Sequence, residues 1–348
     1  MRNYLPFVAG NRELRERLGA DLERGGFSHA YILEGPKGGG KHTLALSLVM
    51  ALACKNRTVS GHSLPCNECE SCRKIREGIS PDVIYIKRPE GRTTMGVDTV
   101  RTLRNDVCVL PNDLDFKVYI IEDADTMTPQ AQNALLLTLE EPPPFVLFLL
   151  LAKESDLLLE TIRSRAPILR LQPVCEEEMR NYLLSPERPA IARSVRALCD
   201  ASPDDFAALL KMANGSIGRA LALLEEKKRA PLLAARATAE EFCTLLAEGT
   251  RQDALLELLL ALPSARDDLQ SRLELIALAL RDLSLLVHSD TAPLVFFTDR
   301  ERAIDLAVRF TPGRLLSYLS ATEQAQGALL LNANTRLTLI QYLCRLIA

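Results

Sequence analysis

The stretch Gly35-Pro-Lys-Gly-Gly-Gly-Lys41-His42-Thr43 decides the fold of this chain. From Gly35 to Lys41 it completes the pattern Gly-x-x-x-x-Gly-Lys of a phosphate-binding loop. A short apolar run at 30–33 precedes the loop, and a strong helix former at 44–53 follows it. Because strand, glycine-rich loop and helix is the arrangement that this motif needs, we predict a nucleotide-binding α/β fold.

The loop keeps its phosphate cradle and lacks its metal ligand. Phosphate would be bound by backbone amides and one ammonium, which belong to Gly38, Gly39, Gly40 and Lys41. His42 stands where a Ser or Thr hydroxyl normally binds Mg²⁺, and imidazole is a poor ligand for this hard cation. Thr43 points about 100° further around the helix axis and does not replace that hydroxyl. ATP therefore remains a candidate ligand, whereas its Mg²⁺-dependent hydrolysis is not expected.

An acidic pair follows the apolar run at 117–121. In ATPases with this loop, the neighbouring strand ends in an Asp that holds Mg²⁺, often followed by a Glu that polarises the attacking water. Here Glu122 precedes Asp123, so one carboxylate is a methylene too long and the next a methylene too short. A displacement of about 1 Å can cost on the order of 10²-fold in rate. Solvated acids in a loop are the alternative interpretation.

Four of the nine cysteines cluster near the end of the helix that follows the loop. They are Cys54, Cys66, Cys69 and Cys72, the last three at two successive Cys-x-x-Cys spacings. In a chain without a secretory signal this spacing favours a tetrahedral, structural Zn²⁺. His62 is the competing fourth ligand, and buried or reactive thiols without metal are the alternative. The other five cysteines stand among apolar residues and are expected in the core.

Composition and charge narrow the function classes. The chain has 348 residues, 47% of them hydrophobic and 25% charged, with a net charge of −3. No apolar stretch is long enough to span a membrane, and the first residues lack the core of a signal peptide, so we expect a cytoplasmic protein. Because no global basic field exists, contact with nucleic acid would be local or shared with partners.

The order of the apolar patterns predicts three parts. Strands are expected at 83–86, 117–121 and 145–151, and helices at 97–107 and 129–140, an alternation typical of a parallel sheet covered by helices. After residue 173 strand signals nearly vanish. We predict an α/β domain over 1–171 that carries the zinc module at 54–72, a helical lid over 172–230, and an all-α domain over 231–348.

Taken together, these motifs resemble subunits of the bacterial DNA polymerase III clamp loader, an AAA+ assembly. The resemblance rests on segments in matching order and spacing: Phe27 to Tyr31, Gly35 to Lys41, the four cysteines, Lys117 to Thr128, Asn133 to Pro143, and Thr161 to Arg165. They cover about half the chain. The resemblance implies an AAA+ domain, a lid and a C-terminal collar that joins other subunits, motor and delta, in a hetero-oligomeric ring. It also implies action on a sliding clamp and primed DNA, with no membrane.

Departures from the family pattern indicate the type of subunit. Motor subunits carry Gly-Lys-Thr or Gly-Lys-Ser, then Asp-Glu, then an Arg in the lid sequence Gly-Ser-x-Arg. Here the corresponding residues are His42, the inverted pair Glu122-Asp123, and Gly218. The combination resembles the rigid subunit that does not itself hydrolyse ATP, and in which Arg165 would act as an arginine finger toward a neighbour. An ATP-hydrolysing motor subunit is the alternative. Two surface arginines, Arg163 and Arg165, would be the simplest alternative for the finger.

Overall fold

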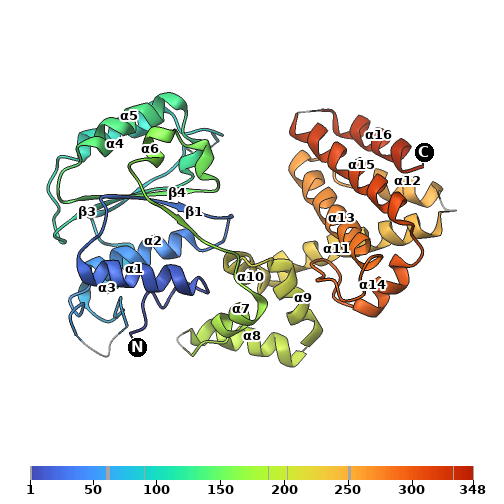
Figure 1. Ribbon diagram of the computed structural model, residues 1–348, viewed down its shortest axis with the longest axis horizontal. Coiled ribbons are helices and arrows are strands. Elements are labelled where there is room, and N and C mark those ends of the chain that lie inside the picture. The colour runs from blue at the N-terminus through green and yellow to red at the C-terminus, as the bar shows by residue number, and fades with distance from the viewer. Residues whose placement is uncertain are drawn as a thin grey trace. The chain divides into compact units, whose positions relative to one another are not determined.

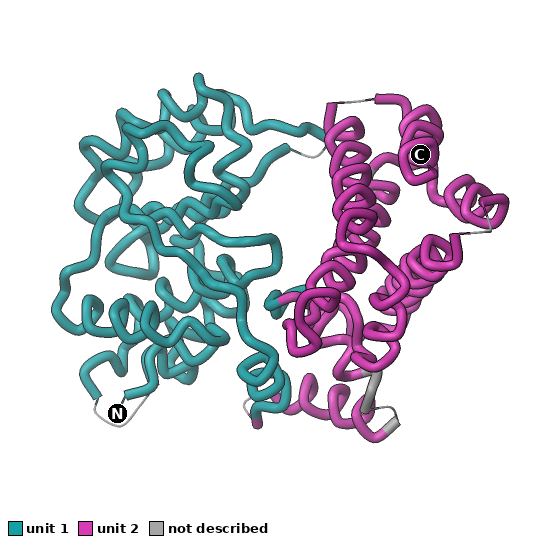
Figure 2. The backbone as a smooth tube through the Cα atoms, turned by 45° about the vertical axis from the view of Figure 1, so that its right-hand side comes forward, with its two compact units in different colours: residues 1–185, 215–219 teal, residues 186–214, 220–348 magenta. Residues whose placement is uncertain are grey.

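The computed structural model describes residues 2–59, 63–89, 91–186, 188–201, 203–249, 252–331 and 333–347. By its contacts the chain divides into two compact units (Figure 2). The first contains residues 1–185 and 215–219, and the second contains residues 186–214 and 220–348.

A five-stranded parallel sheet forms the middle of the first unit. Its order is β2-β3-β4-β1-β5. The strands are β1 (Ala30–Glu34), β2 (Val83–Ile86), β3 (Lys117–Ile121), β4 (Val146–Ala152) and β5 (Ile168–Arg170). All residues of β3 and β4 are buried, as the near-continuous apolar runs of inner parallel strands require. The carboxyl ends of β1 and β3 therefore lie on the same edge of the sheet, where they present the glycine loop and the acidic pair.

Helices cover both faces of this sheet (Figure 1). One face packs against α1 (Arg12–Arg24), α2 (Lys41–Ala53) and α3 (Glu70–Arg76) through a core that includes Leu18, Leu48 and Ile75. The other packs against α4 (Val97–Asp106), α5 (Pro129–Glu140) and α6 (Glu160–Arg163). Short 3-10 turns, η1 (Ala124–Thr126) and η2 (Ser155–Leu157), and the helix α7 (Glu176–Leu183) complete this part.

The described part of the second unit consists of helices and the loops that connect them. Its helices are α8 (Pro189–Ala201), α9 (Pro203–Ala213), the end of α10 (Ile217–Leu223), α11 (Glu226–Glu248), α12 (Gln252–Leu260), α13 (Arg266–Leu286), α14 (Arg300–Ala307), α15 (Pro312–Leu330) and α16 (Thr335–Ile347). A single core of Leu, Ala and Phe side chains joins α11 to α16. None of the described helices is long and apolar enough to cross a membrane.

The structure confirms the predicted fold class, a parallel sheet with flanking helices and a helical C-terminal region. The strands at 83–86 and 117–121 and the helix at 129–140 have the predicted bounds. The expectation of five buried cysteines outside the cluster is wrong in part, because Cys108, Cys175 and Cys344 are exposed. The three-part division at 171 and 230 stays a prediction. Near its second boundary, α11 runs without interruption through Pro231.

Candidate functional site: the phosphate loop and its surroundings

The phosphate loop leads from β1 into α2 as the sequence predicts. Gly38 and Gly40 have φ angles of 75° and 96°, a left-handed conformation that disfavours side chains and explains glycine at both positions. Lys41 is the first residue of α2. Its Nζ donates hydrogen bonds to the carbonyl oxygens of Gly35 and Pro36 at 2.6 and 3.1 Å. Burial lowers the pKa of this ammonium, although the charges of Asp125 and Asp123 oppose the shift.

Residues Gly215–Arg219 fold against the phosphate loop and belong to the same unit. The Gly218 N–H donates to the Gly38 carbonyl at 3.0 Å. A Cβ at Gly218 would lie only 3.0 Å from the Gly38 Cα, so no larger residue fits there without a shift. A Cβ at Gly38 would lie 2.5 Å from the Ser216 Oγ. Gly218, the residue that departs from the family pattern, is thus in direct backbone contact with the phosphate loop.

A lysine and a histidine side chain lie beside Glu122, the first residue of the acidic pair. The Lys87 Nζ lies 3.2 Å from the Glu122 carboxylate, and the His42 Nε2 lies 3.8 Å from it. The His42 ring stacks on Tyr85, with ring centres 5.6 Å apart. Burial, together with the Glu122 charge, raises the pKa of the Tyr85 hydroxyl. The structure thus brings together the two predicted residues, His42 and Glu122, beside Lys87, in a cluster whose only oxygen ligand for Mg²⁺ is the Glu122 carboxylate.

Asp123 lies outside this cluster. It adopts a left-handed conformation with φ 47°, and its carboxylate is 3.7 Å from the Arg88 guanidinium. Sequence reasoning missed Lys87 and Arg88, which directly follow β2. They could have been inferred from strand order, since the carboxyl ends of the neighbouring parallel strands β2 and β3 meet at one edge of the sheet. Mg²⁺ is usually bound through one or two carboxylates, and here both carboxylates of the acidic pair lie beside cationic side chains, Lys87 and Arg88.

The four clustered cysteines meet as the spacing predicts. One sulfur atom from each of Cys54, Cys66, Cys69 and Cys72 lies within 4.8 Å of the others, a group that could hold a metal ion. Cys54 ends α2, while Cys69 and Cys72 lie at the start of α3. The alternative ligand, His62, lies outside the described residues.

The local environment acts differently on these thiols. Burial raises the pKa of Cys54 and, more strongly, that of Cys72. Burial also acts to raise the pKa of Cys66, but backbone N–H groups of Cys69 and Glu68 and the neighbouring thiols outweigh it and bring the value to about 7. The environment of Cys66 thus favours its thiolate, the form that binds metals. Tetrahedral zinc is the ion that this closed set of four thiols fits best.

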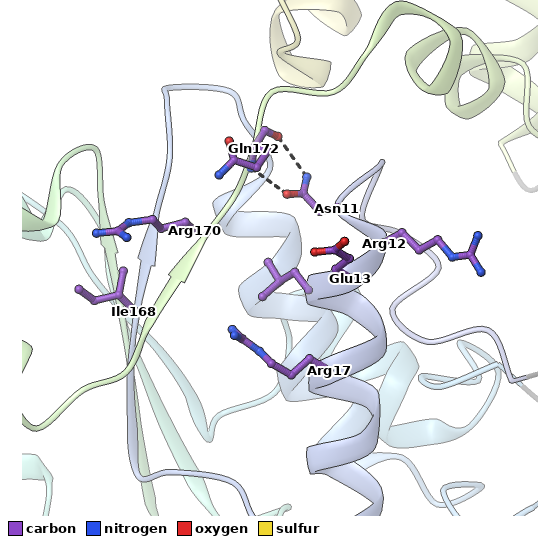
Figure 3. A pocket seen from close by; sticks show the side chains of 8 residues that line it. Asn11, Arg12, Glu13, Arg17, Ile168, Arg170 and Gln172 are labelled. Carbon is purple, nitrogen blue, oxygen red and sulfur yellow. Dashed lines mark hydrogen bonds between the residues drawn. The ribbon is translucent and has the colours of Figure 1, made fainter.

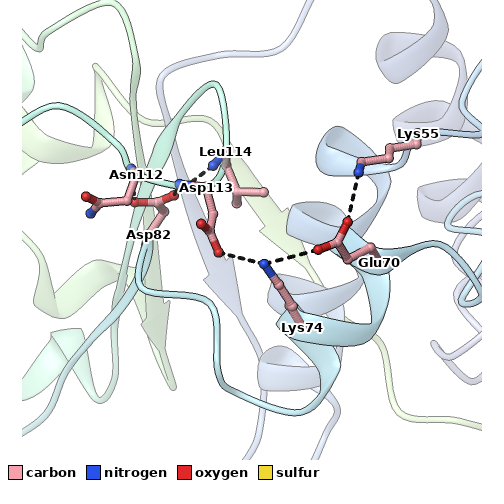
Figure 4. A network of polar contacts seen from close by, with 7 residues as sticks. All are labelled: Lys55, Glu70, Lys74, Asp82, Asn112, Asp113 and Leu114. Atoms are coloured by element: carbon pink, nitrogen blue, oxygen red, sulfur yellow. Dashed lines mark hydrogen bonds and ion pairs between the residues drawn. The ribbon is translucent and has the colours of Figure 1, made fainter.

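A polar network ties the cysteine module to the sheet (Figure 4). Lys74 of α3 contacts Glu70 and Asp113 at 3.3 and 3.0 Å. Nearby, the fully buried carboxylate of Asp82 accepts three backbone hydrogen bonds of 2.6 to 2.8 Å from residues 112–114. This carboxylate holds the loop that enters β3, and therefore fixes the strand that presents the acidic pair.

Arg165 follows α6 on the same unit. Its NH2 group lies 2.8 Å from the Glu140 carboxylate, at the end of α5, and its NH1 group donates to the Thr161 carbonyl at 3.0 Å. The side chain is 37% exposed, so donor hydrogens remain at the surface. Arg163 is bound elsewhere, to Asp156 at 2.7 Å. Glu140 was missed by sequence reasoning, although it lies in the Leu-Glu-Glu-Pro segment that supports the resemblance.

Part of the first unit is similar to known proteins. Residues 10–175 match the family described as DNA polymerase III, delta subunit. The gamma subunit of DNA polymerase III from Buchnera aphidicola is 32% identical over 222 residues, 64% of this chain and 58% of that protein. The delta' subunit from Escherichia coli is 33% identical over 210 residues, 60% of this chain and 58% of that protein. The chain thus spans somewhat over half the length of these relatives.

Among solved structures, a gamma subunit-related protein of DNA polymerase III from Thermotoga maritima covers 95% of this chain and 98% of its own. Its TM-score is 0.42 and its sequence identity 17%.

Proposed function

We propose that this chain is a delta-prime-type subunit of a DNA polymerase III clamp loader, on the basis of the similarity of residues 10–175 to the delta-subunit family and of the chain to a delta' subunit. In this role it is a scaffold that hydrolyses ATP negligibly and supplies Arg165 to the active site of a neighbouring ATPase subunit. The neighbours are motor and delta subunits of a cytoplasmic, hetero-oligomeric ring. Their shared task is to load a sliding clamp onto primed DNA during replication.

The observation that carries the proposal is the pair of side chains beside Glu122. The Lys87 ammonium forms an ion pair with the carboxylate that would otherwise help to hold Mg²⁺, and the His42 ring lies 3.8 Å from the same carboxylate. Without the metal, the charge that develops on a transferred phosphoryl group loses its main stabilising partner. Lys41, which would reach a phosphate, is bonded to carbonyls of its own loop. Each feature weakens a different part of ATP hydrolysis.

Arg165 supports the second half of the proposal. Glu140 and the Thr161 carbonyl each take one side of the guanidinium, which has five N–H donors and therefore keeps others for a ligand. A guanidinium held in this way is pre-organised and loses less entropy when it meets a phosphate. In well-studied GTPases an arginine finger contributes roughly 10³ to 10⁵ in rate.

We also propose that the four-cysteine cluster holds one structural Zn²⁺. A closed set of four protein ligands leaves no position for a substrate, which distinguishes structural from catalytic zinc. Cys54 and Cys72 lie in the core of the first unit, so the ion would brace α2 against α3.

The test compares Arg165→Ala with Arg163→Ala in the reconstituted assembly. The two residues are close in sequence, equally charged and each paired with one carboxylate. Arg165→Ala should leave assembly intact, while it slows the ATPase of the adjacent subunit and clamp loading by about tenfold or more. The expected loss is below the GTPase figure because other subunits keep their own fingers. Equal effects of the two substitutions, or an effect of Arg165→Ala on assembly alone, would refute the finger role.

An ATP-hydrolysing motor subunit of the gamma/tau type is the second candidate. The complete Gly35 to Lys41 motif and the similarity to a gamma subunit favour it. Steady ATP turnover by the isolated chain above about 1 s⁻¹, within the ordinary enzyme range, would support this candidate against the first.

A further inference from the structure

The strand β5 is the last of the sheet and pairs only with β1. Hydrogen bonds join β1 to the Pro167 carbonyl at 3.0 Å and to the Leu171 N–H at 2.8 Å. Backbone groups of a strand point alternately to its two sides, so those of Ile168 and Arg170 point away from β1. Within the described part of the chain, no strand lies on that side.

Gln172 is the next residue whose backbone groups point away from β1, and these groups already have a partner. The Asn11 amide donates to the Gln172 carbonyl at 3.1 Å, and the Gln172 N–H donates to the Asn11 Oδ1 at 2.7 Å. This reciprocal pair is what a residue of an added strand would form. The Asn11 side chain thus occupies the outward backbone groups of residue 172, while those of residues 168 and 170 stay available to an added strand.

A groove runs beside these positions (Figure 3). Its volume is about 590 Å³, and it is lined by the first turns of α1, residues 11–14 and 17, and by Ile168, Arg170 and Gln172. The Arg17 side chain extends from α1 on the side of β5. The groove therefore combines an open strand edge with a charged wall.

The wall of the groove carries three arginines, one of which forms no ion pair with a described residue. Arg12, Arg17 and Arg170 line the groove, and Glu13 is the one carboxylate among the lining residues. Arg12 is paired with Glu16 at 2.8 Å and Arg170 with Glu34 at 3.2 Å. Arg17 is exposed and forms no ion pair with a described residue. A ligand with a carboxylate at the level of Arg17 would gain this guanidinium as its partner.

We propose that this groove binds an extended, acidic segment of a partner protein, which adds as a strand to β5 at Ile168 and Arg170 and places a carboxylate against Arg17. Alternating N–H and C=O groups along the edge match a peptide backbone, which supplies the same groups in return. A nucleic acid would satisfy the positive wall but not the donors and acceptors of the edge. The proposal does not depend on ATP chemistry or on Arg165.

The test uses the full chain and a fluorescent peptide of alternating Val and Glu, followed by anisotropy at low salt. A peptide of alternating Val and Lys is the charge control, and the Val-Glu peptide with every backbone amide methylated, so that neither edge can donate, is the backbone control. We expect the acidic peptide alone to bind, and Arg17→Glu to weaken binding about tenfold or more. No binding at about 1 mM peptide, or equal binding of any control peptide, would overturn the proposal.

A pair of variants tests strand addition itself. Arg170→Ala and Arg170→Pro both remove the guanidinium, but only the second removes the outward N–H. Proline is tolerated on an edge strand when its missing N–H faces outward. We expect Arg170→Pro to bind the peptide about fivefold more weakly than Arg170→Ala, by the loss of one hydrogen bond, while both keep the thermal stability of the native chain.

Equal affinities of these two folded variants would refute pairing with β5, and a loss of fold in Arg170→Pro would show that its N–H is used within the sheet, which also refutes it. Stronger binding of single-stranded DNA than of the peptide, abolished by Arg17→Glu, would assign the groove to nucleic acid instead. Self-association of the chain abolished by Arg17→Glu would assign it to a second copy.

Discussion

Replacing Gly218 by alanine should destabilise the first unit, although the same change usually stabilises a helix. The new Cβ would lie 3.0 Å from the Gly38 Cα and 3.1 Å from the Gly38 carbonyl oxygen, where ordinary contacts begin at 3.4 Å. Overpacking of this kind costs about 1–3 kcal/mol. The helix propensity of alanine returns at most about 1 kcal/mol. We expect a net loss of about 1–2 kcal/mol, or a melting temperature lower by about 2–8 °C for a unit of this size.

Gly327 supplies the matched control within α15. A Cβ there meets nothing within 4 Å, so Gly327→Ala should stabilise its helix by about 0.5–1 kcal/mol. Differential scanning calorimetry of the two variants measures opposite signs for one chemical change. If Gly218→Ala raises the melting temperature as Gly327→Ala does, the described contact with Gly38 does not constrain the loop.

Gly218→Ala also tests whether the contact between Gly218 and Gly38 opposes nucleotide binding. If nucleotide binding has to break this contact, weakening the contact by about 1–2 kcal/mol should raise the affinity for a fluorescent ADP analogue about 5- to 30-fold. Titration without Mg²⁺ measures this directly. Lower stability with unchanged affinity would mean that closure and nucleotide binding are independent.

Removal of zinc or the change Cys72→Ser should expose the amides of α3 to hydrogen exchange, because structural zinc in small peptides binds with about 10–16 kcal/mol. The same change at the exposed Cys344 is the control. Metal analysis that finds well under one zinc per chain in protein prepared without chelators would contradict the site. Asp82→Asn should lower the free energy of unfolding by about 2–4 kcal/mol, since a buried side-chain amide cannot accept hydrogen bonds from all three N–H groups. Asp113→Asn is the control: its side chain is partly exposed and pairs with Lys74, so its loss should cost under about 1 kcal/mol. Burial acts to raise the pKa of Asp82, but the three backbone N–H groups hold it below the ordinary value. Its stabilisation is thus complete above the unfolded pKa, near 3.9, and is lost as the pH falls through the lower folded value; a difference between native and variant that grows on acidification would contradict this.

Elements with a strong local pattern could be predicted from the sequence. The buried runs at 117–121 and 146–152 and the helix that begins at Pro129 show their type in their own residues. The cysteine spacing likewise predicted the cluster, because its ligands are close in sequence and a tight turn leaves them few other arrangements.

Contacts set by strand order could not be predicted in the same way. Lys87 meets Glu122 because β2 is the neighbour of β3, and Glu140 meets Arg165 because α5 and α6 pack on the same face. The three-residue strand β5 has too little length for a pattern of its own. Its place beside β1, and hence the groove beside Arg17, follows only from the assembled sheet.

The helix α10 begins within the first unit and ends within the second. Seven residues at 1.5 Å each make it a rod of about 10 Å. A tilt of about 10° would move one end by roughly 2 Å relative to the other, on the basis of that length. If the far end of α10 stays in place, such a displacement would lengthen the 3.0 Å hydrogen bond between Gly218 and Gly38 beyond hydrogen-bonding distance. A tilt of α10 would therefore act on the phosphate loop through this hydrogen bond.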